Sequence, residues 1–444
     1  MKTNKKMNVF FLLLYIFFLN SVYCFSQNVL TYFPETNGKV NAIVTKGDTA
    51  YIGGDFTTVG GLNRNHLAAI FIKTGVVLNW DPNADQSVTS LAINGNVIYV
   101  GGFIAKIGGQ DRTAIAAIDA ITGVVMNWNP IITYQTFYRT VQTIAYGNNK
   151  LFISGGFDNI NGSILKKLNK ALLDATTGQL ITDFTLNGNI YTTQTTNTTL
   201  YVGGDFDTID TQSRPFLGAI NLATNIVNNW SPNPNNRINK LLLNKGKLYM
   251  GGKFNIIGAS FKNGLACIDT SNGLPASWNP LANGSSVTDM AITSDAIYVT
   301  GYGNPLVSYD LTNGIQKDYW ASGGVLASYG DTVIVGGSFT KVGWVNRNYL
   351  FAVTKGLSLG VNEIENRFRK INMYPNPTSK SILFSLNERG TILISNILGI
   401  KVLEQEISKN NEEQKIDISE LASGIYTLKI ITEDKIYSNK FLKD

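Results

Sequence analysis

The string Tyr51-Ile-Gly-Gly-Asp-Phe56 decides the fold, because it returns along the chain at a nearly fixed interval. Successive copies lie mostly about 48 residues apart. A period of this length is typical of repeat architectures in which each unit is one small supersecondary structure. The six other copies begin at Tyr99, Phe152, Tyr201, Tyr249, Tyr298 and Val333.

Each repeat carries four strand signals separated by turn residues. In the second repeat the signals are Val88–Ile93, the copy at Tyr99, Ala114–Asp119 and Val124–Trp128. Asn-Gly and Thr-Gly pairs stand between them, where the backbone needs a positive φ. Four strands per unit at this period predict an all-β fold, a seven-bladed β-propeller. The tryptophans that recur at the fourth strand are expected to pack between blades: Trp80, Trp128, Trp230, Trp278 and Trp320.

The seventh repeat ends without a fourth strand of its own. The segment Asn28–Pro34 has the fourth-strand pattern and precedes the first repeat. We expect this N-terminal strand to pair into the seventh blade, because pairing closes the ring and removes exposed sheet edges. Blade six is shortened around Gly303, between its second and third strands.

The first 26 residues read as a signal peptide, with lysines before the apolar run Val9–Leu19 and cleavage expected after Ser26. The run is short for a membrane span and no second one follows, so we expect no transmembrane span in the mature chain. The formal charge of +6 falls when the leading lysines leave, which makes nucleic acid a poor candidate partner. Cys24 leaves too, so Cys267 is the only cysteine of the mature chain and is expected to be a buried small hydrophobe.

A second module follows the repeats, and alternation in its apolar runs predicts a small, Ig-like antiparallel β-sandwich. Its landmarks are Tyr374, Pro375, Asn376, Pro377, Gly399, Gly424, Tyr426, Lys440 and Lys443. Together they resemble the type A C-terminal sorting domain of the type IX secretion system of Bacteroidota. This resemblance implies export across the outer membrane by the type IX secretion machinery and removal of the module. The repeats resemble secreted propellers of the delta-60 type.

These observations divide the chain into four parts. They are a signal peptide (1–26), a seven-bladed β-propeller (27–356), a linker (357–370) and a type IX secretion sorting domain (371–444). The expected location is the extracellular space or the outer cell surface, reached through the periplasm.

No catalytic constellation is found in the sequence. His66 is the only histidine, which excludes two-histidine zinc motifs, and no metal or other cofactor is expected. Residues of the first strands should line the central channel: Asn41, Thr89, Gln142, Tyr191, Asn239, Thr288 and Leu326. Asp289 is the only adjacent acid, so an acid and base pair is lacking and we expect no enzyme.

A cation precedes the third strand in six repeats: Arg64, Arg112, Lys167, Arg214, Lys262 and Arg347. If exposed, these residues would form a broken basic ring that binds acidic glycans or other anions. The alternative is that each cation hydrogen-bonds loop carbonyls of its own blade, as consensus positions in repeats usually do. The same face should carry the aromatic residues Tyr134, Tyr138 and Trp344, which suit carbohydrate stacking or ordinary packing.

The sequence therefore favours an exported surface or secreted binding protein of the adhesion type, whose ligand is a glycan or a surface protein. Two alternatives stay open. An extracellular polysaccharide hydrolase or lyase would need facing acids in the channel. A structural component of a surface assembly would need a broad exposed apolar patch.

Overall fold

The computed structural model describes residues 29–134, 139–165, 169–182, 186–280, 286–301, 304–320, 322–342, 345–354, 368–396, 401–409, 413–432 and 436–444. The chain divides into two compact units, Met1–Lys355 and Gly356–Asp444. Every regular element of the described residues is a β-strand. Within that same part of the chain, no helix is long and apolar enough to span a membrane.

Within its described part, the first unit contains seven antiparallel repeat sheets, numbered 1 to 7 in chain order. Their first strands are β1 (Val40–Lys46), β7 (Val88–Asn94), β13 (Thr140–Gly147), β19 (Ile190–Thr195), β24 (Ile238–Asn244), β29 (Val287–Ile292) and β33 (Val325–Tyr329). The second strands are β2 (Thr49–Gly54), β8 (Val97–Gly102), β14 (Lys150–Gly156), β20 (Thr199–Gly204), β25 (Lys247–Gly252), β30 (Ala296–Gly301) and β34 (Thr332–Gly336). The third strands are β5 (Leu67–Phe71), β11 (Ile115–Asp119), β17 (Lys170–Asp174), β23 (Leu217–Asn221), β28 (Leu265–Asp269), β31 (Asn304–Asp310) and β37 (Leu350–Thr354).

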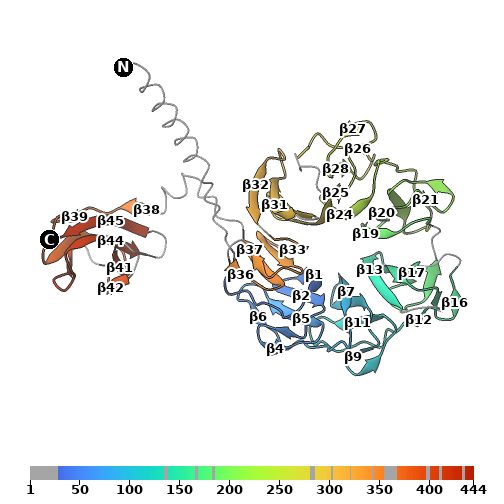
Figure 1. Ribbon diagram of the computed structural model, residues 1–444, viewed down its shortest axis with the longest axis horizontal. Helices are drawn as coiled ribbons and strands as arrows, with labels where there is room; N and C mark the ends of the chain where they lie inside the picture. Colours follow the sequence, from blue (N-terminus) through green and yellow to red (C-terminus); the bar gives the residue numbers. More distant parts are fainter. Residues whose placement is uncertain are drawn as a thin grey trace, which may run out of the picture. The chain divides into compact units, whose positions relative to one another are not determined.

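The fourth strands are short. They are β6 (Val76–Val77), β18 (Leu180–Thr182) and β32 (Gln316–Trp320), and single bridges at Val125, Val227 and Pro275 take their place in sheets 2, 4 and 5. Each first strand contacts the first strand of the next sheet, and β33 contacts β1, so the series of contacts returns to its start. Figure 1 shows the sheets set around a common centre that the first strands face.

The paired glycines of the repeated string allow the sheets to approach closely. A Cβ atom on Gly53 would lie 2.4 Å from Cγ1 of Val88 in the next sheet, and one on Gly54 would lie 2.1 Å from the Lys39 carbonyl oxygen. Gly336 stands in the same relation to Val40, at 2.6 Å, where sheet 7 meets sheet 1. No side chain fits at these positions, which explains why the string repeats.

The aromatic residues of the string pack against the recurring tryptophans. Tyr51 and Trp80 meet edge to face with centroids 5.2 Å apart, and the Tyr249 and Trp278 rings do so at 5.5 Å. The indole Nε1 of Trp80 also donates to the Asp119 carbonyl of the next sheet, at 3.0 Å. The predicted packing of these tryptophans between repeats is thus observed, and the predicted burial of Cys267 is confirmed.

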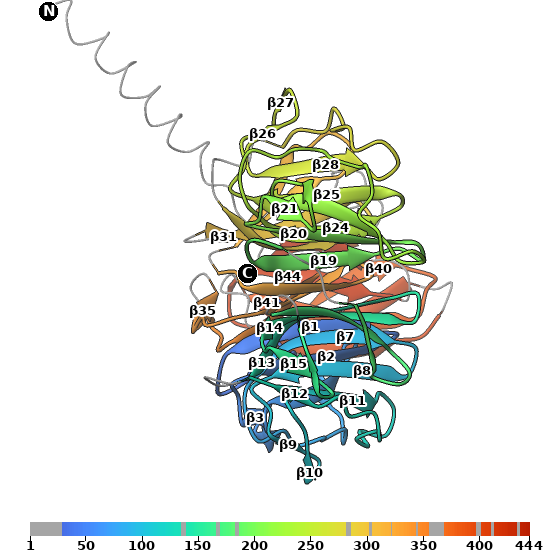
Figure 2. The same cartoon turned by 90° about the vertical axis from the view of Figure 1, so that its right-hand side faces the viewer.

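Two-stranded hairpins connect the second and third strands in six repeats of the described chain. They are β3 (Thr58–Val59) with β4 (Leu62–Asn63), β9 (Lys106–Ile107) with β10 (Gln110–Asp111), β15 (Asn159–Ile160) with β16 (Ser163–Ile164), β21 (Thr208–Ile209) with β22 (Gln212–Ser213), β26 (Ile256–Ile257) with β27 (Ser260–Phe261), and β35 (Lys341–Val342) with β36 (Val345–Asn346). Strand β12 (Ile132–Thr133) pairs with β15. Sheet 6 continues from β30 to the adjacent β31, so its shortening is seen directly. Hairpins β9–β10 and β26–β27 lie on the outer rim of the unit in both views (Figures 1 and 2).

The N-terminal residues of the described chain lie along the third strand of sheet 7. Val29 forms a bridge with Val353, and the Leu30 N–H donates to the Ala352 carbonyl at 2.8 Å. This position corresponds to the fourth strand of the other sheets.

The second unit contains two sheets around a buried apolar core. Their strands are β38 (Phe368–Lys370), β39 (Met373–Tyr374), β40 (Ser381–Ser385), β41 (Gly390–Asn396), β42 (Lys401–Ile407), β43 (Glu413–Asp417), β44 (Gly424–Ile431) and β45 (Ile436–Lys443). One sheet has the order β38-β45-β44-β41-β42 and the other β39-β40-β43. Phe384, Ile392 and Leu428 are fully buried members of the shared core.

Candidate binding site at the central cavity

The consensus cations point into the protein. Four of them donate to a carbonyl 14 residues further along the chain: Arg64 to Leu78 at 2.8 Å, Arg112 to Met126 at 2.8 Å, Arg214 to Asn228 at 2.6 Å and Lys262 to Ala276 at 2.8 Å. Arg112, Arg214 and Lys262 expose between 5% and 9% of their surface. Burial also lowers the pKa of Arg112 and of Lys262.

For these buried members the structure supports the reading in which each cation hydrogen-bonds carbonyls of its own blade, and not the exposed basic ring. A short fourth strand leaves some of its carbonyls without a backbone N–H partner. The side chain of the cation donates hydrogen bonds to these carbonyls. Lys167 lies outside the described residues.

Arg347 also donates hydrogen bonds to backbone carbonyls, but these carbonyls belong to the N-terminal segment. Its guanidinium donates to the carbonyls of Phe33 at 3.0 Å and Thr31 at 2.7 Å. Glu35 lies 3.6 Å from it and accepts from the Asn348 side chain at 2.8 Å. Arg347 is 8% exposed, so it too is unsuited to an open basic ring.

The predicted aromatic residues do not form a described cluster. Tyr134 is half-buried next to β12. Tyr138 and Trp344 lie outside the described residues. His66 is half-buried and has a φ of 63°, and its Nδ1 lies 3.0 Å from the Gly54 carbonyl oxygen.

The first strands line a central cavity of about 370 Å³. Five of the predicted channel residues line it: Asn41, Thr89, Gln142, Tyr191 and Leu326. The pairing register skips one residue near the start of every first strand from sheet 1 to sheet 6, and the skipped residue is the predicted one. A bulge turns the side chain away from the ladder. In sheet 7 the register is continuous at Leu326.

The side chains of several bulge residues form hydrogen bonds to the next sheet. Asn41 donates to the Val88 carbonyl at 3.2 Å, Thr89 to the Val141 carbonyl at 2.8 Å, and Asn239 to the Val287 carbonyl at 2.8 Å. The neutral polar channel lining expected from the sequence therefore joins neighbouring sheets.

An ion pair that the sequence did not reveal crosses the cavity wall between sheets 5 and 6. Lys240 Nζ lies 2.5 Å from Asp289 Oδ1, and both residues line the cavity. The second oxygen of Asp289 accepts from the Leu326 N–H at 2.9 Å. Lys240 was missed because the bulge at Asn239 shifts the alternation by one residue.

Tyr191 is the one aromatic residue among the bulge positions. Its ring is 39% exposed, and its hydroxyl donates to Asp205 Oδ2 at 2.6 Å. The Asp205 carboxylate, together with partial burial, raises the pKa of Tyr191. The guanidinium carbon of Arg237 lies 5.6 Å from the ring centroid.

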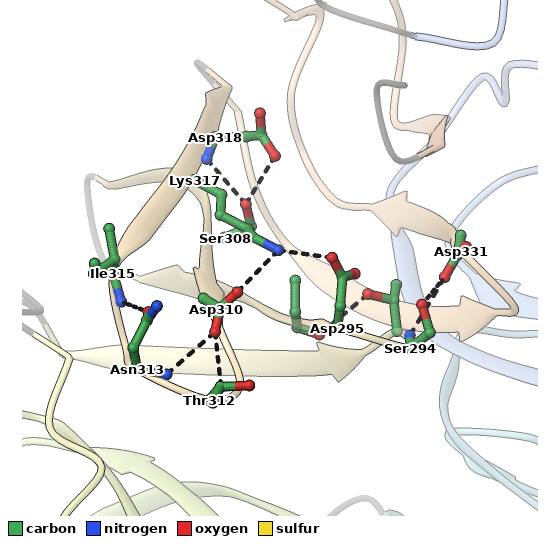
Figure 3. Close-up of polar contacts among 12 residues, drawn as sticks. Ser294, Asp295, Ser308, Asp310, Thr312, Asn313, Ile315, Lys317, Asp318 and Asp331 are labelled. Carbon is green, nitrogen blue, oxygen red and sulfur yellow. Dashed lines mark hydrogen bonds and ion pairs between the residues drawn. The ribbon is translucent and has the colours of Figure 1, made fainter. Parts of the chain in front are cut away.

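A second polar cluster lies at the turns of sheet 6 (Figure 3). Lys317 Nζ lies 2.7 Å from Asp295 and 3.2 Å from Asp310, while Ser294 donates to Asp331 of sheet 7 at 2.5 Å. Turn amides, Thr312 first, lower the pKa of Asp310. No group of three possible metal ligands occurs within the described residues, so this cluster is a salt-bridged turn.

The residues predicted for the sorting motif meet at one end of the second unit. The Asn376 side chain donates to the Lys440 carbonyl at 3.0 Å and accepts from the Leu442 N–H at 3.0 Å. Gly424 pairs with Lys443, and the Tyr426 ring stacks on Phe441 with centroids 5.5 Å apart. Tyr374 donates to Glu413. Gly399 lies outside the described residues.

Residues 372–444 match the family described as the secretion system C-terminal sorting domain. This is the class of tail that marks proteins for type IX secretion. The protein is therefore exported by that system to the cell surface or the extracellular space. No curated protein matches the chain.

Solved structures with low sequence identity share the β-propeller fold. The β-propeller domain of Cps50 (Swd1) from Myceliophteria thermophila is 13% identical, with a TM-score of 0.50 over 73% of this chain and 100% of that one. A chain of a mitotic checkpoint complex is also 13% identical, with a TM-score of 0.50 over 76% of this chain and 94% of that one. The WD40 β-propeller domain of Doa1 is 12% identical and has a TM-score of 0.49, with 74% of this chain and 97% of that one covered. At such identities the first two likenesses show the fold alone.

Proposed function

We propose that the protein is a non-enzymatic binding protein of the cell surface or medium, with a glycan or a protein as its ligand. In this proposal the seven repeat sheets are the blades of one seven-bladed propeller, closed by the N-terminal segment. The chain begins with a signal peptide over residues 1–26, resembles delta-60-type propellers of Bacteroidota, and ends in an Ig-like sandwich.

One observation carries the binding role: a constant frame presents different exposed side chains on its rim. The buried cations and paired glycines recur, whereas the hairpins expose Leu62 by 48%, Ile164 by 73% and Phe261 by 66%. Variable loops on a rigid scaffold are a common physical basis of recognition.

The cavity chemistry supports a binding protein over a hydrolase. Asp289 is the one acid among the described residues that line the cavity, and Lys240 neutralises it. A glycoside hydrolase of the usual kind needs two carboxyl groups about 5 to 10 Å apart, facing the same bond. The lining described here offers one.

The test is a binding array of glycans and surface proteins probed with the full chain, run beside an assay for released sugar. Saturable binding without product is expected, and Ile164→Ser with Phe261→Ser should weaken it about ten-fold, since each removes a large exposed apolar side chain. Val124→Ser is the matched control, because Val124 is 61% exposed at the opposite end of a third strand. Released sugar, or binding that ignores the rim variants, would contradict the proposal.

A structural role in a surface assembly is the second candidate. Exposed apolar side chains recur at the turn after the third strand, with exposed fractions from 56% to 65%: Val76, Val124, Ile226, Leu274 and Ile315. In an assembly that uses this face, Val124→Ser would weaken association and the rim variants would not.

A further inference from the structure

The bulge residues of the central cavity differ in whether their side chains form hydrogen bonds to the next sheet. In sheets 1, 2 and 5 the bulge residues Asn41, Thr89 and Asn239 are bonded to the next sheet. Leu326 of sheet 7 is apolar. The ion pair between Lys240 and Asp289 closes the wall between sheets 5 and 6.

Sheets 3 and 4 differ, because their bulge residues, Gln142 and Tyr191, make no hydrogen bond to the next sheet within the described residues. Gln142 is exposed, and its side-chain amide makes no hydrogen bond within the described residues. Thr143 beside it is half-buried and lines the same cavity. The ring of Tyr191 follows in sheet 4, partly exposed and held at its hydroxyl by Asp205.

Arg237 does not line the cavity, but it places a positive charge beside Tyr191, which does. Its guanidinium lies against the Tyr191 ring, and its buried Nε has no hydrogen-bond partner in the described part of the chain. None of the ion pairs between described residues involves Arg237. The guanidinium therefore retains its capacity for a carboxylate.

We propose that the cavity wall formed by Gln142 and Tyr191, together with Arg237 beside the Tyr191 ring, binds a sugar residue at the end of a glycan, with preference for a sugar that carries a carboxylate. This inference rests on the proposed binding function and names its ligand class. A cavity of about 370 Å³ lies within the usual range for small ligands, about 300 to 1,000 Å³.

Each of the three residues has a separate task in this site. The exposed part of the Tyr191 ring offers an aromatic face to the C–H groups of the sugar ring. The Gln142 amide both donates to and accepts from hydroxyls, so it fits a polyhydroxy ligand. Arg237 pairs with the carboxylate. A phosphate could pair with the same cation, but it has no C–H groups to pack against the aromatic face.

The experiment is titration calorimetry of the full chain with glucuronic and galacturonic acid and with glucose and galactose, each as monosaccharide and short oligosaccharide. The uronic sugars should bind saturably and more tightly than the neutral ones. Tyr191→Ala should weaken all binding about ten-fold, and Arg237→Gln should weaken only the uronic sugars by a similar factor. Gln142→Ala serves as a second variant if Tyr191→Ala unfolds.

Lys247→Ala is the matched control, because Lys247 is an exposed cation at the far end of strand β25. Glycan binding that survives Tyr191→Ala and Gln142→Ala unchanged would overturn the cavity site and leave the binding function intact. A protein ligand on the array with no sugar bound would do the same. An absence of every ligand would remove both proposals together.

Discussion

At the scale of single residues, the same interaction between a cation and backbone carbonyls recurs around the molecule. A buried cation two residues before a left-handed position binds the carbonyls of a strand too short to satisfy itself. The backbone N–H of that left-handed residue donates to the carbonyl at the end of the repeated string, as Ala114 does to Ile104 at 2.9 Å. The residue that looked most like a ligand contact from its periodicity is therefore structural.

Arg112→Ala tests this role. It should lower the free energy of unfolding by about 2 to 3 kcal/mol, because hydrogen bonds from a charged group are lost and the Met126 carbonyl is left without this donor. Arg112→Lys should recover most of the loss, since Lys262 occupies the equivalent place in sheet 5. The measurement is urea unfolding followed by tryptophan fluorescence. Unchanged stability with weakened glycan binding would instead return Arg112 to a binding surface.

Sequence reasoning found the spacing of these cations and included hydrogen bonds to carbonyls of their own blade, but it did not identify the partner carbonyl. The partner carbonyl lies 14 residues away and becomes a neighbour only when the third and fourth strands pair. The regular spacing itself indicated a structural role, because a residue that recurs in each repeat stabilises the structure that the repeats have in common. Tyr191 shows the opposite case, since it breaks the pattern of its bulge position.

At the scale of elements, the repeat unit could be predicted because its first three strands are five to eight residues long, which is enough for alternation to show. The hairpins could not be predicted as strands, because each has two residues per strand and no room for alternation. The bulges were also invisible, although they decide which side chain enters the cavity. The bulge is the reason that Lys240 was not predicted to line the cavity, whereas most of the channel residues selected by their position do line it.

The turn after the third strand depends on a carboxylate in four sheets. Oδ1 of Asp119 accepts from the Thr122 N–H at 2.7 Å, and this bond is the first cause of its lowered pKa. Asp174 and Asp310 have lowered pKa values for the same reason. A carboxyl group whose pKa is lower in the folded state stabilises the fold above its unfolded pKa, and that contribution is lost as the pH falls through the folded value.

The Tm should therefore fall when the pH drops below about 4. The triple variant Asp119→Asn, Asp174→Asn, Asp310→Asn should be less stable than the parent at pH 7 and should lose less stability between pH 6 and pH 3. Asparagine can serve in this turn, because Asn221 accepts the equivalent bond from the Thr224 N–H at 3.0 Å. Calorimetry across this pH range provides the measurement. Parallel pH curves for parent and variant would show that the turn carboxylates are not the titrating groups.

At the scale of the whole molecule, the seam between sheets 7 and 1 differs from the others because its fourth strand comes from the start of the chain. Arg347 holds the carbonyls of Thr31 and Phe33, and Glu35 holds Asn348 in return. Elsewhere the cation binds a segment only 14 residues away, whereas Arg347 and Thr31 are separated by 316 positions. Contacts of such long sequence separation form late and are lost first when a ring opens.

Arg347→Ala should consequently open this seam before the rest of the propeller unfolds. Hydrogen exchange of the Leu30 N–H, which donates to Ala352, should accelerate at least ten-fold, because the strand loses its side-chain clamp while keeping only backbone bonds. Amides of β8 and β14 should keep their protection. Arg112→Ala is the matched variant within one sheet and should leave Leu30 exchange unchanged. Equal acceleration at Leu30 and in β8 would mean that the ring opens as one cooperative unit and that Arg347 has no special part in closing it.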